Sequence, residues 1–242
     1  MLDLDAVVHH HIQDDPHAAL VGLVHQVFQA LLVAVVGIYL GEVQRPVAVV
    51  GVEGEVALLA ATDEALQQAQ WQPTTTEQQE RTATIIASGV GGFPAIADAV
   101  RTADTRGTRK LSPFTIPSFL VNLAAGHVSI KYGFKGTLGA PVTACAAGVQ
   151  AIGDAARMIR AGEVDVAICG GAEACIHTVS LGGFAAARAL SSGFNDEPTR
   201  ASRPFDRDRD GFVMGEGAGI LVIESLDHAL ARGAQPIAEI VG

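Results

Sequence analysis

The chain has 242 residues, of which 49% are hydrophobic and 17% are charged, and 27 are glycine. This composition is typical of a packed α/β protein and excludes a disordered chain. The formal net charge of −10 argues against nucleic acid as a partner. The three cysteines form no CxxC pair, and their odd number fits a reducing compartment, so we expect a cytoplasmic protein.

The first sixty residues show no pattern that assigns a fold or a function. Residues 18–40 are apolar over a length that would suit a membrane helix. Polar residues interrupt this stretch, and acidic rather than basic residues precede it, so we expect no stable membrane span and no signal peptide. Histidines cluster over residues 9–17 without acidic or cysteine partners at ligand spacing, so we expect no functional metal site there.

From residue 61 onward the sequence predicts helices that alternate with strands. The alternation indicates a layered α/β sheet with at least some parallel pairing. The expected elements are a helix over 61–71 capped by Thr62 or Asp63, a strand over 82–89, a helix over 116–130, a strand over 139–144, a helix over 147–161, a strand over 164–169, a short helix over 184–190, a strand over 218–224, a helix over 226–232 and a strand over 237–241.

Two features within these elements have an ordinary structural interpretation. The glycine-rich residues 89–92 lack the spacing and the Lys-Ser/Thr of a phosphate loop, so we interpret them as a tight turn beside a pocket. His127 lies alone within a buried helical pattern, and we expect a hydrogen-bonded core residue rather than a catalyst.

Cys145 is the strongest candidate for chemistry. An apolar strand is expected to lead into it, small residues surround it, and a helical pattern begins directly behind it. A helix N-terminus favours a thiolate, and small neighbours let a substrate carbonyl approach closely, as a nucleophile for acyl transfer requires. An inert buried thiol is the alternative. We expect Cys169 and Cys175 to be core residues.

Six segments together resemble the β-ketoacyl-[acyl carrier protein] synthases, the condensing enzymes of fatty-acid and polyketide assembly, and above all their elongating bacterial type II members. These segments are SGVGG (88–92), residues 112–136, VTACAAG (142–148), residues 153–174, GGFAAARALS (182–191) and residues 202–224, which include GFVMGEGAG. The match runs from about residue 61 to residue 242. We therefore expect residues 1–60 to be unassigned and residues 61–242 to form the synthase N-terminal domain.

The resemblance implies a thiolase-like layered α/β fold, here essentially its N-terminal half with a mixed sheet flanked by helices. In the family, the C-terminal half contributes two histidines, a lysine and a glycine-rich loop. These lie outside this sequence, so we expect a fragment that gives no measurable condensation by itself. The unmatched residues 1–60 are interpreted as a frame or gene-boundary artefact.

The resemblance also implies a reaction and a set of site residues. Cys145 would accept an acyl group as a thioester, with its own backbone N–H as one oxyanion donor. Malonyl-carrier protein would then lose carbon dioxide and condense with the acyl group. Val90 and Phe184 would lie near the acyl-chain pocket, with ordinary core packing as the alternative for each. No metal or organic cofactor is implied, because acyl carrier protein delivers both thioesters on its phosphopantetheine, and family members are usually homodimers.

Several alternatives remain at this point. The chain could be a non-catalytic truncated or pairing subunit, a polyketide ketosynthase or, with less support, a thiolase. In the charged run over 203–212 we favour an internal salt-bridge network over a calcium loop, because arginines alternate with the aspartates and no glutamate stands at the twelfth position. For the basic residues over 106–110 we favour a solvated loop over a partner-binding patch.

Overall fold

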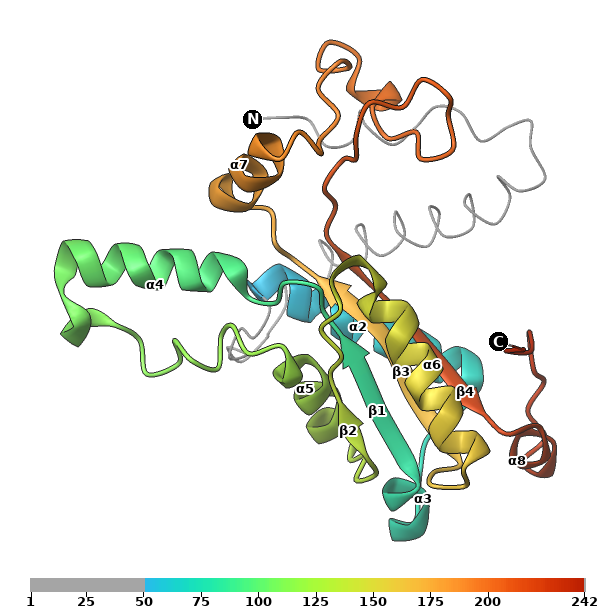
Figure 1. The fold of residues 1–242 in the computed structure, drawn as a ribbon. Coiled ribbons are helices and arrows are strands. Elements are labelled where there is room, and N and C mark those ends of the chain that lie inside the picture. Colours follow the sequence, from blue (N-terminus) through green and yellow to red (C-terminus); the bar gives the residue numbers. More distant parts are fainter. Residues whose placement is uncertain (1–50, 242) are drawn as a thin grey trace. The chain divides into compact units, whose positions relative to one another are not determined.

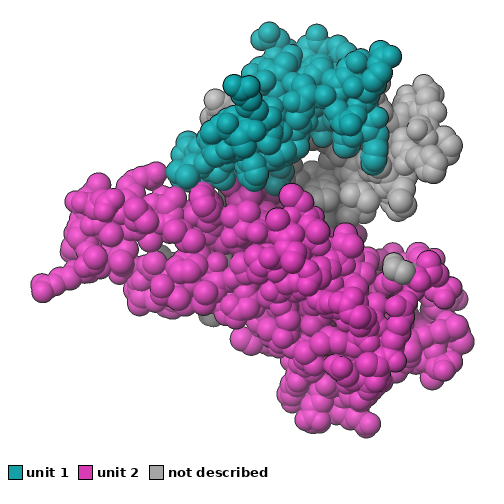
Figure 2. All heavy atoms as spheres, viewed as in Figure 1, with its two compact units in different colours: residues 1–34, 176–215 teal, residues 35–175, 216–242 magenta. Residues whose placement is uncertain are grey.

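The structure of the protein is a computed structural model that describes residues 51–241. The chain divides into two compact units, coloured separately in Figure 2. Among the described residues, the smaller unit comprises 176–215 and the larger unit comprises 51–175 and 216–241. Residues 9–17 and 18–40, with their predictions, lie outside the described part of the chain.

The larger unit is built on a mixed four-stranded sheet (Figure 1). Its strands are β1 (Thr82–Ala87), β2 (Leu138–Gly139), β3 (Val166–Glu173) and β4 (Gly217–Glu224), in the spatial order β2-β1-β3-β4. Strand β1 is parallel to both of its neighbours, whereas β3 and β4 are antiparallel. All six residues of β1 are buried, as befits a central strand covered on both faces.

Helices cover both faces of this sheet. Helix α6 packs on one face against β1 and β3, and α2 and α5 lie on the other (Figure 1). The helices of the larger unit are α2 (Gly51–Ala69), α3 (Thr76–Glu80), α4 (Phe93–Arg106), α5 (Asn122–Tyr132), α6 (Ala147–Arg160) and α8 (Leu226–Ala231), with short 3-10 turns η2 (Thr108–Lys110) and η3 (Ala144–Ala146). No helix within residues 51–241 is long and apolar enough to cross a membrane.

Small side chains bring α6 close to the sheet. Ala147, Ala151 and Ala155 recur every four residues and therefore form one stripe along the helix. This stripe packs against Ala83, Ile85 and Ala87 of β1 and Ala167 and Cys169 of β3, all of them buried. The methyl groups fix a short distance between the helix and the two central strands.

Four of the predicted elements are confirmed with small shifts at their ends, namely those that correspond to β1, α6, β4 and α8. The strand predicted over 164–169 begins at Val166 and continues to Glu173.

The predicted start of the first helix is wrong. Helix α2 already begins at Gly51, and Thr62 lies buried inside it. The hydroxyl of Thr62 donates a hydrogen bond to the carbonyl of Leu58, 2.8 Å away. Threonine makes this bond to the preceding turn in a helix interior as readily as it caps a helix, so its presence did not mark a boundary.

Other predicted boundaries are wrong as well. The helix predicted from residue 116 begins only at Asn122. The short helix predicted over 184–190 is instead α7 (Thr178–Ala186), because the His177 side chain accepts a hydrogen bond from the Val179 N–H and caps an earlier start. Residues 237–241 form no strand.

The smaller unit consists of α7, the turn η4 (Pro198–Arg200) and connecting loops. The Asp210 carboxylate accepts hydrogen bonds from the N–H groups of Ser192 and Gly193, at 3.0 and 2.7 Å, and so joins two loops. The salt-bridge network predicted for the charged run appears only as local, largely exposed pairs, such as Arg207 with Asp208 at 3.4 Å. Within the described residues no three His, Cys, Asp or Glu side chains form a metal-binding group.

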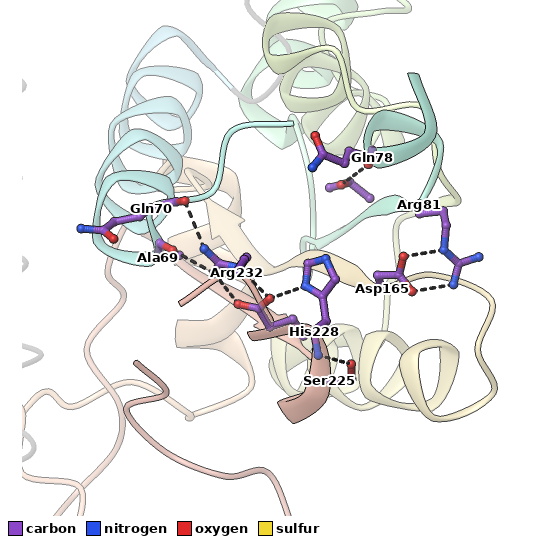
Figure 3. A network of polar contacts seen from close by, with 10 residues as sticks. Ala69, Gln70, Gln78, Arg81, Asp165, Ser225, His228 and Arg232 are labelled. Carbon is purple, nitrogen blue, oxygen red and sulfur yellow. Dashed lines mark hydrogen bonds and ion pairs between the residues drawn. The ribbon is translucent and has the colours of Figure 1, made fainter. Parts of the chain in front are cut away.

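Three ion pairs fasten the end of the sheet at which β1 and β3 begin (Figure 3). Arg81 forms two bonds to Asp165, at 2.5 and 2.6 Å, directly before these strands. At the end of β4, Glu224 binds both Arg232, at 2.9 Å through Nε, and His228, at 2.6 Å. Arg232 also donates to the carbonyls that end α2, and thereby joins α8, β4 and α2.

These contacts lower the pKa values of both carboxyl groups. The hydrogen bond from Arg81 lowers the pKa of Asp165 below 3.8, against an opposing effect of burial. For Glu224, burial is the largest single influence and raises the pKa, but the hydrogen bonds and charges of Arg232 and His228 together lower it below 4.5. Such groups stabilise the fold above their unfolded pKa values, and this stability is lost as the pH falls through the folded values.

The first prediction concerns Gly170, which has a φ of +147° and would place an added Cβ 2.0 Å from the Gly219 carbonyl oxygen. Gly170→Ala is expected to lower the free energy of unfolding by about 3 kcal/mol, since it adds both strain and overlap. Gly219→Ala is the matched control, because nothing lies within 4 Å of its added Cβ. Urea unfolding followed by the fluorescence of Trp71, the single tryptophan, measures both. Equal losses would contradict the account.

The second prediction concerns acid stability. Glu224→Gln is expected to lower the free energy of unfolding by about 2 kcal/mol at pH 7, because charged hydrogen bonds are lost. The difference from the unsubstituted chain should shrink as the pH falls below about 4.5, because the carboxyl group is then protonated first in the unfolded chain and, at a still lower pH, in the folded chain. Glu197→Gln, in an exposed pair with Arg200, is the control and should change little. A difference that stays constant from pH 7 to pH 3 would refute the assignment.

Candidate active site

Cys145 lies in η3, between the end of β2 and the first turn of α6. The strand predicted to run up to residue 144 ends at Gly139, so an irregular segment leads to the cysteine. Ala144 has a φ of +51°, in the left-handed region that non-glycine residues rarely adopt. Such a conformation costs about 1–3 kcal/mol and persists only where its surroundings enforce it. This sharp turn leaves Cys145 exposed, two residues before α6 begins.

Glycines allow the start of α6 to approach the strand ends. An added Cβ on Gly171 of β3 would lie 3.3 Å from the Ala87 carbonyl oxygen and 3.5 Å from the Gly148 Cα. Because β1 and β3 are parallel, their carboxyl ends meet at one edge of the sheet. Ligand sites of open α/β sheets lie at this edge. Cys145 is therefore positioned where such a site is expected.

Glu173, the last residue of β3, binds the turn that follows β1, a role that was not predicted from the sequence. Its Oε1 accepts hydrogen bonds from the Ser88 hydroxyl at 2.9 Å and the Gly91 N–H at 3.2 Å. Its Oε2 accepts from the N–H groups of Gly89 and Val90, at 2.7 and 3.0 Å. The signal in the sequence was a carboxylate at the end of one buried strand and a glycine turn after another.

The turn over 88–92 is packed on two sides. An added Cβ on Gly89 would lie 3.1 Å from the Ala144 carbonyl oxygen, so the turn contacts the backbone directly before Cys145. An added Cβ on Gly92 would lie 2.2 Å from the Ser118 carbonyl oxygen. Glycine is needed on both sides because another backbone approaches so closely. The Val90 side chain, in the same turn, is 42% exposed.

The remaining predicted site residues lie elsewhere. Phe184 belongs to the smaller unit, where its ring meets that of Phe212 edge to face at 5.0 Å. The structure brings Val90 and Cys145 into the same unit, and the joint pocket of Val90 and Phe184 stays a prediction. His127 is hydrogen-bonded as expected, with its Nδ1 2.9 Å from the buried Glu55 carboxylate.

The other two cysteines are buried, as predicted. Burial raises the pKa of the Cys169 thiol to about 12. The pKa of Cys175 is also raised, first by burial and then by the charges of Glu173 and Glu216. Both thiols are therefore protonated at neutral pH, and both are shielded from solvent, whereas Cys145 is exposed.

The third prediction follows from this difference. Iodoacetamide at pH 7.5 should modify Cys145 at least about ten times faster than Cys169 or Cys175, because alkylation needs an accessible thiolate. Peptide mass spectrometry gives the three rates, and the same reaction in 6 M guanidinium should make them similar. Equal rates in the native chain would contradict the exposed position of Cys145.

Comparisons with known proteins show the family to which this chain is related. The model of the β-ketoacyl synthase N-terminal domain matches residues 45–229. The chain is 53% identical over 187 residues to 3-oxoacyl-[acyl-carrier-protein] synthase 2 of Rhizobium meliloti (strain 1021), which covers 77% of this chain and 44% of that protein. It is 52% identical over 184 residues to the mitochondrial 3-oxoacyl-[acyl-carrier-protein] synthase of Arabidopsis thaliana, over 76% and 40% of the two chains. The chain thus spans less than half the length of these curated relatives.

Solved structures support the same relationship. A β-ketoacyl synthase from Burkholderia phymatum STM815 is similar with a TM-score of 0.68 and 31% identity, over 76% of this chain and 44% of that one. The ketosynthase complex AntDE:AntF gives a TM-score of 0.68 and 33% identity, over 75% and 46%. The predicted thiolase-like layered α/β fold is confirmed. The chain belongs to the β-ketoacyl synthase family, whose N-terminal domain it contains.

Proposed function

We propose that this chain is the acyl-accepting part of a 3-oxoacyl-[acyl-carrier-protein] synthase, an acyltransferase of fatty-acid biosynthesis. The observation that carries the proposal is the position of Cys145: an exposed thiol on a left-handed turn at the start of α6. The likeness to proteins named 3-oxoacyl-[acyl-carrier-protein] synthase supports it.

In the first half-reaction, the Cys145 thiolate attacks the carbonyl carbon of an acyl thioester. The backbone N–H of Cys145 stabilises the oxyanion that forms, since a fixed donor is most effective where charge develops. The carbon–sulfur bond to the phosphopantetheine of acyl carrier protein then breaks. Its sulfur leaves with the proton that Cys145 gave up, and the acyl group remains on Cys145 as a thioester.

In the second half-reaction, malonyl-carrier protein loses carbon dioxide, and its carbanion attacks the acyl group on Cys145. The product is a 3-oxoacyl chain two carbons longer, and the Cys145 thiolate is released. We propose that a C-terminal domain outside this sequence supplies the groups that stabilise the carbanion. The greater length of the relatives supports this division. The N-terminal synthase domain that we propose over residues 61–242 lies largely within the residues 45–229 that the family model matches.

We propose that Val90 and Phe184 contribute to the pocket for the acyl chain. An apolar chain gains about 0.8 kcal/mol for each methylene that it buries, so apolar side chains suit this role. The contact between the 88–92 turn and the Ala144 backbone supports a place for Val90 beside the thiol.

The proposed partners are acyl carrier protein and a second copy of the full-length chain, and no metal or organic cofactor takes part. One structural relative is a type II PKS acyl-carrier protein in complex with its ketosynthase, which supports recognition of a carrier protein. Near Cys145, Val142 and Val149 are 54% and 74% exposed, which supports coverage of this side by a further protein surface. The odd number of cysteines, without a CxxC pair, favours a reducing compartment, and we propose the cytoplasm.

A polyketide ketosynthase is the second candidate, because the AntDE:AntF complex is named as a type II PKS assembly and binds a hexaketide. The identity to that chain is 33%, against 53% to a 3-oxoacyl-[acyl-carrier-protein] synthase 2, so the fatty-acid assignment has more support. The exposed cysteine argues against a non-catalytic pairing subunit.

The fourth prediction tests the acyl-acceptor role. Incubation with fatty acyl-carrier-protein thioesters of 6 to 16 carbons should transfer one acyl group to Cys145, detectable in the intact mass and in the Cys145 peptide. Cys145→Ala should abolish the transfer, whereas Cys169→Ala should not. Val90→Phe should lower transfer of the longest chains about tenfold and spare the shortest, since the larger ring fills the pocket. Transfer in Cys145→Ala would overturn the proposal, and an unchanged chain-length profile would overturn the role of Val90.

A further inference from the structure

We propose that Glu173 is a positioning residue for Cys145. Its carboxylate binds the turn over 88–92, and this turn supports the backbone segment directly before the Cys145 thiol. The inference rests on the proposed function, since it assigns Glu173 a part in acyl transfer to Cys145.

The carboxylate binds four donors from one short turn. Three of them are consecutive backbone N–H groups, those of Gly89, Val90 and Gly91, and the fourth is the hydroxyl of the buried Ser88. Consecutive N–H groups that converge form a concave anion site. Here a side chain of the protein itself occupies that site, so the turn is fixed to the end of β3.

The turn over 88–92 also limits the movement of the segment before Cys145. The contact is between Gly89 and the Ala144 carbonyl, where even one added methyl group would lie within 3.1 Å. Ala144 is the residue with a φ of +51°, so it needs surroundings that keep it in this conformation. The turn over 88–92, which Glu173 fixes, lies next to Ala144 and forms part of these surroundings.

Loss of the Glu173 carboxylate should therefore lower the rate of acylation of Cys145 more than the rate of its alkylation. Alkylation needs only an accessible thiolate, whereas acyl transfer also needs the sulfur and the oxyanion donor in a fixed arrangement. When the turn relaxes, Ala144 can leave the left-handed region and carry Cys145 away from this arrangement. The ratio of the acylation rate to the alkylation rate thus reports positioning, and a general loss of structure would not lower it in this way.

Two variants separate charge from shape. Glu173→Ala removes all four acceptor bonds. Glu173→Gln keeps the size of the side chain and can still accept from Gly89 and Val90, while its amide donates to the Ser88 hydroxyl. Glu163→Gln is the matched control, because Glu163 lies on the surface close to the opposite end of β3.

The fifth prediction compares these variants in the full chain by hydrogen exchange and by reaction at Cys145. Glu173→Ala should speed exchange in peptides over 88–92 and 143–146 and leave β1 and β3 protected. It should lower the rate of acylation by an octanoyl-carrier-protein thioester about tenfold, while iodoacetamide alkylation of Cys145 changes less than about twofold. Glu173→Gln should give intermediate values, and Glu163→Gln should match the unsubstituted chain.

The inference is overturned by unchanged exchange over 88–92 in Glu173→Ala, by faster exchange there without a change over 143–146, or by equal losses of acylation and alkylation. Exposure of Cys169 and Cys175 to iodoacetamide in Glu173→Ala would also overturn it, because it would mean unfolding. If the unsubstituted chain accepts no acyl group, the proposed function fails instead, and exchange over 143–146 then decides by itself whether Glu173 holds the turn.

Discussion

The close packing of α6 on β1 and β3 is the constraint on which the rest of the site depends. Alanines on the helix and glycines at the strand ends leave only short distances between these elements. The chain enters α6 by a sharp turn, at which Ala144 adopts a left-handed conformation. Cys145 follows this turn, and its exposure at the carboxyl ends of parallel strands results from the packing beneath it.

The two ends of the sheet have different roles. At one end, Arg81–Asp165 and the contacts of Glu224 with Arg232 and His228 fasten β1, β3 and β4 to the neighbouring helices. At the other end, Glu173 binds only the turn beside the cysteine. The charges at the first end stabilise the fold, whereas Glu173 at the second end determines the shape of the site. A mutation of Glu173 should therefore lower the rate of acyl transfer without a matching loss of stability.

Elements with a single strong signal could be predicted from the sequence. Strand β1 and helix α6 have clear apolar patterns, and the small residues around Cys145 pointed to a nucleophile. Helix starts were harder, because Thr62 bonds inside a helix and His177 caps one, and neither role follows from residue type. Glu173 was missed because its four partners come from a turn that lies 82–85 positions earlier in the chain, which is close only once β1 and β3 pair.

The central claim is that Cys145 forms a thioester whose carbonyl oxygen faces the backbone N–H of Cys145 itself. A crystal structure of the chain after reaction with an octanoyl thioester tests this most directly. The account predicts a carbon–sulfur bond at the Cys145 Sγ, with the acyl oxygen about 3 Å from that N–H and the alkyl chain beside Val90. An adduct on Cys169 or Cys175, or an acyl oxygen turned away from the N–H, would contradict it.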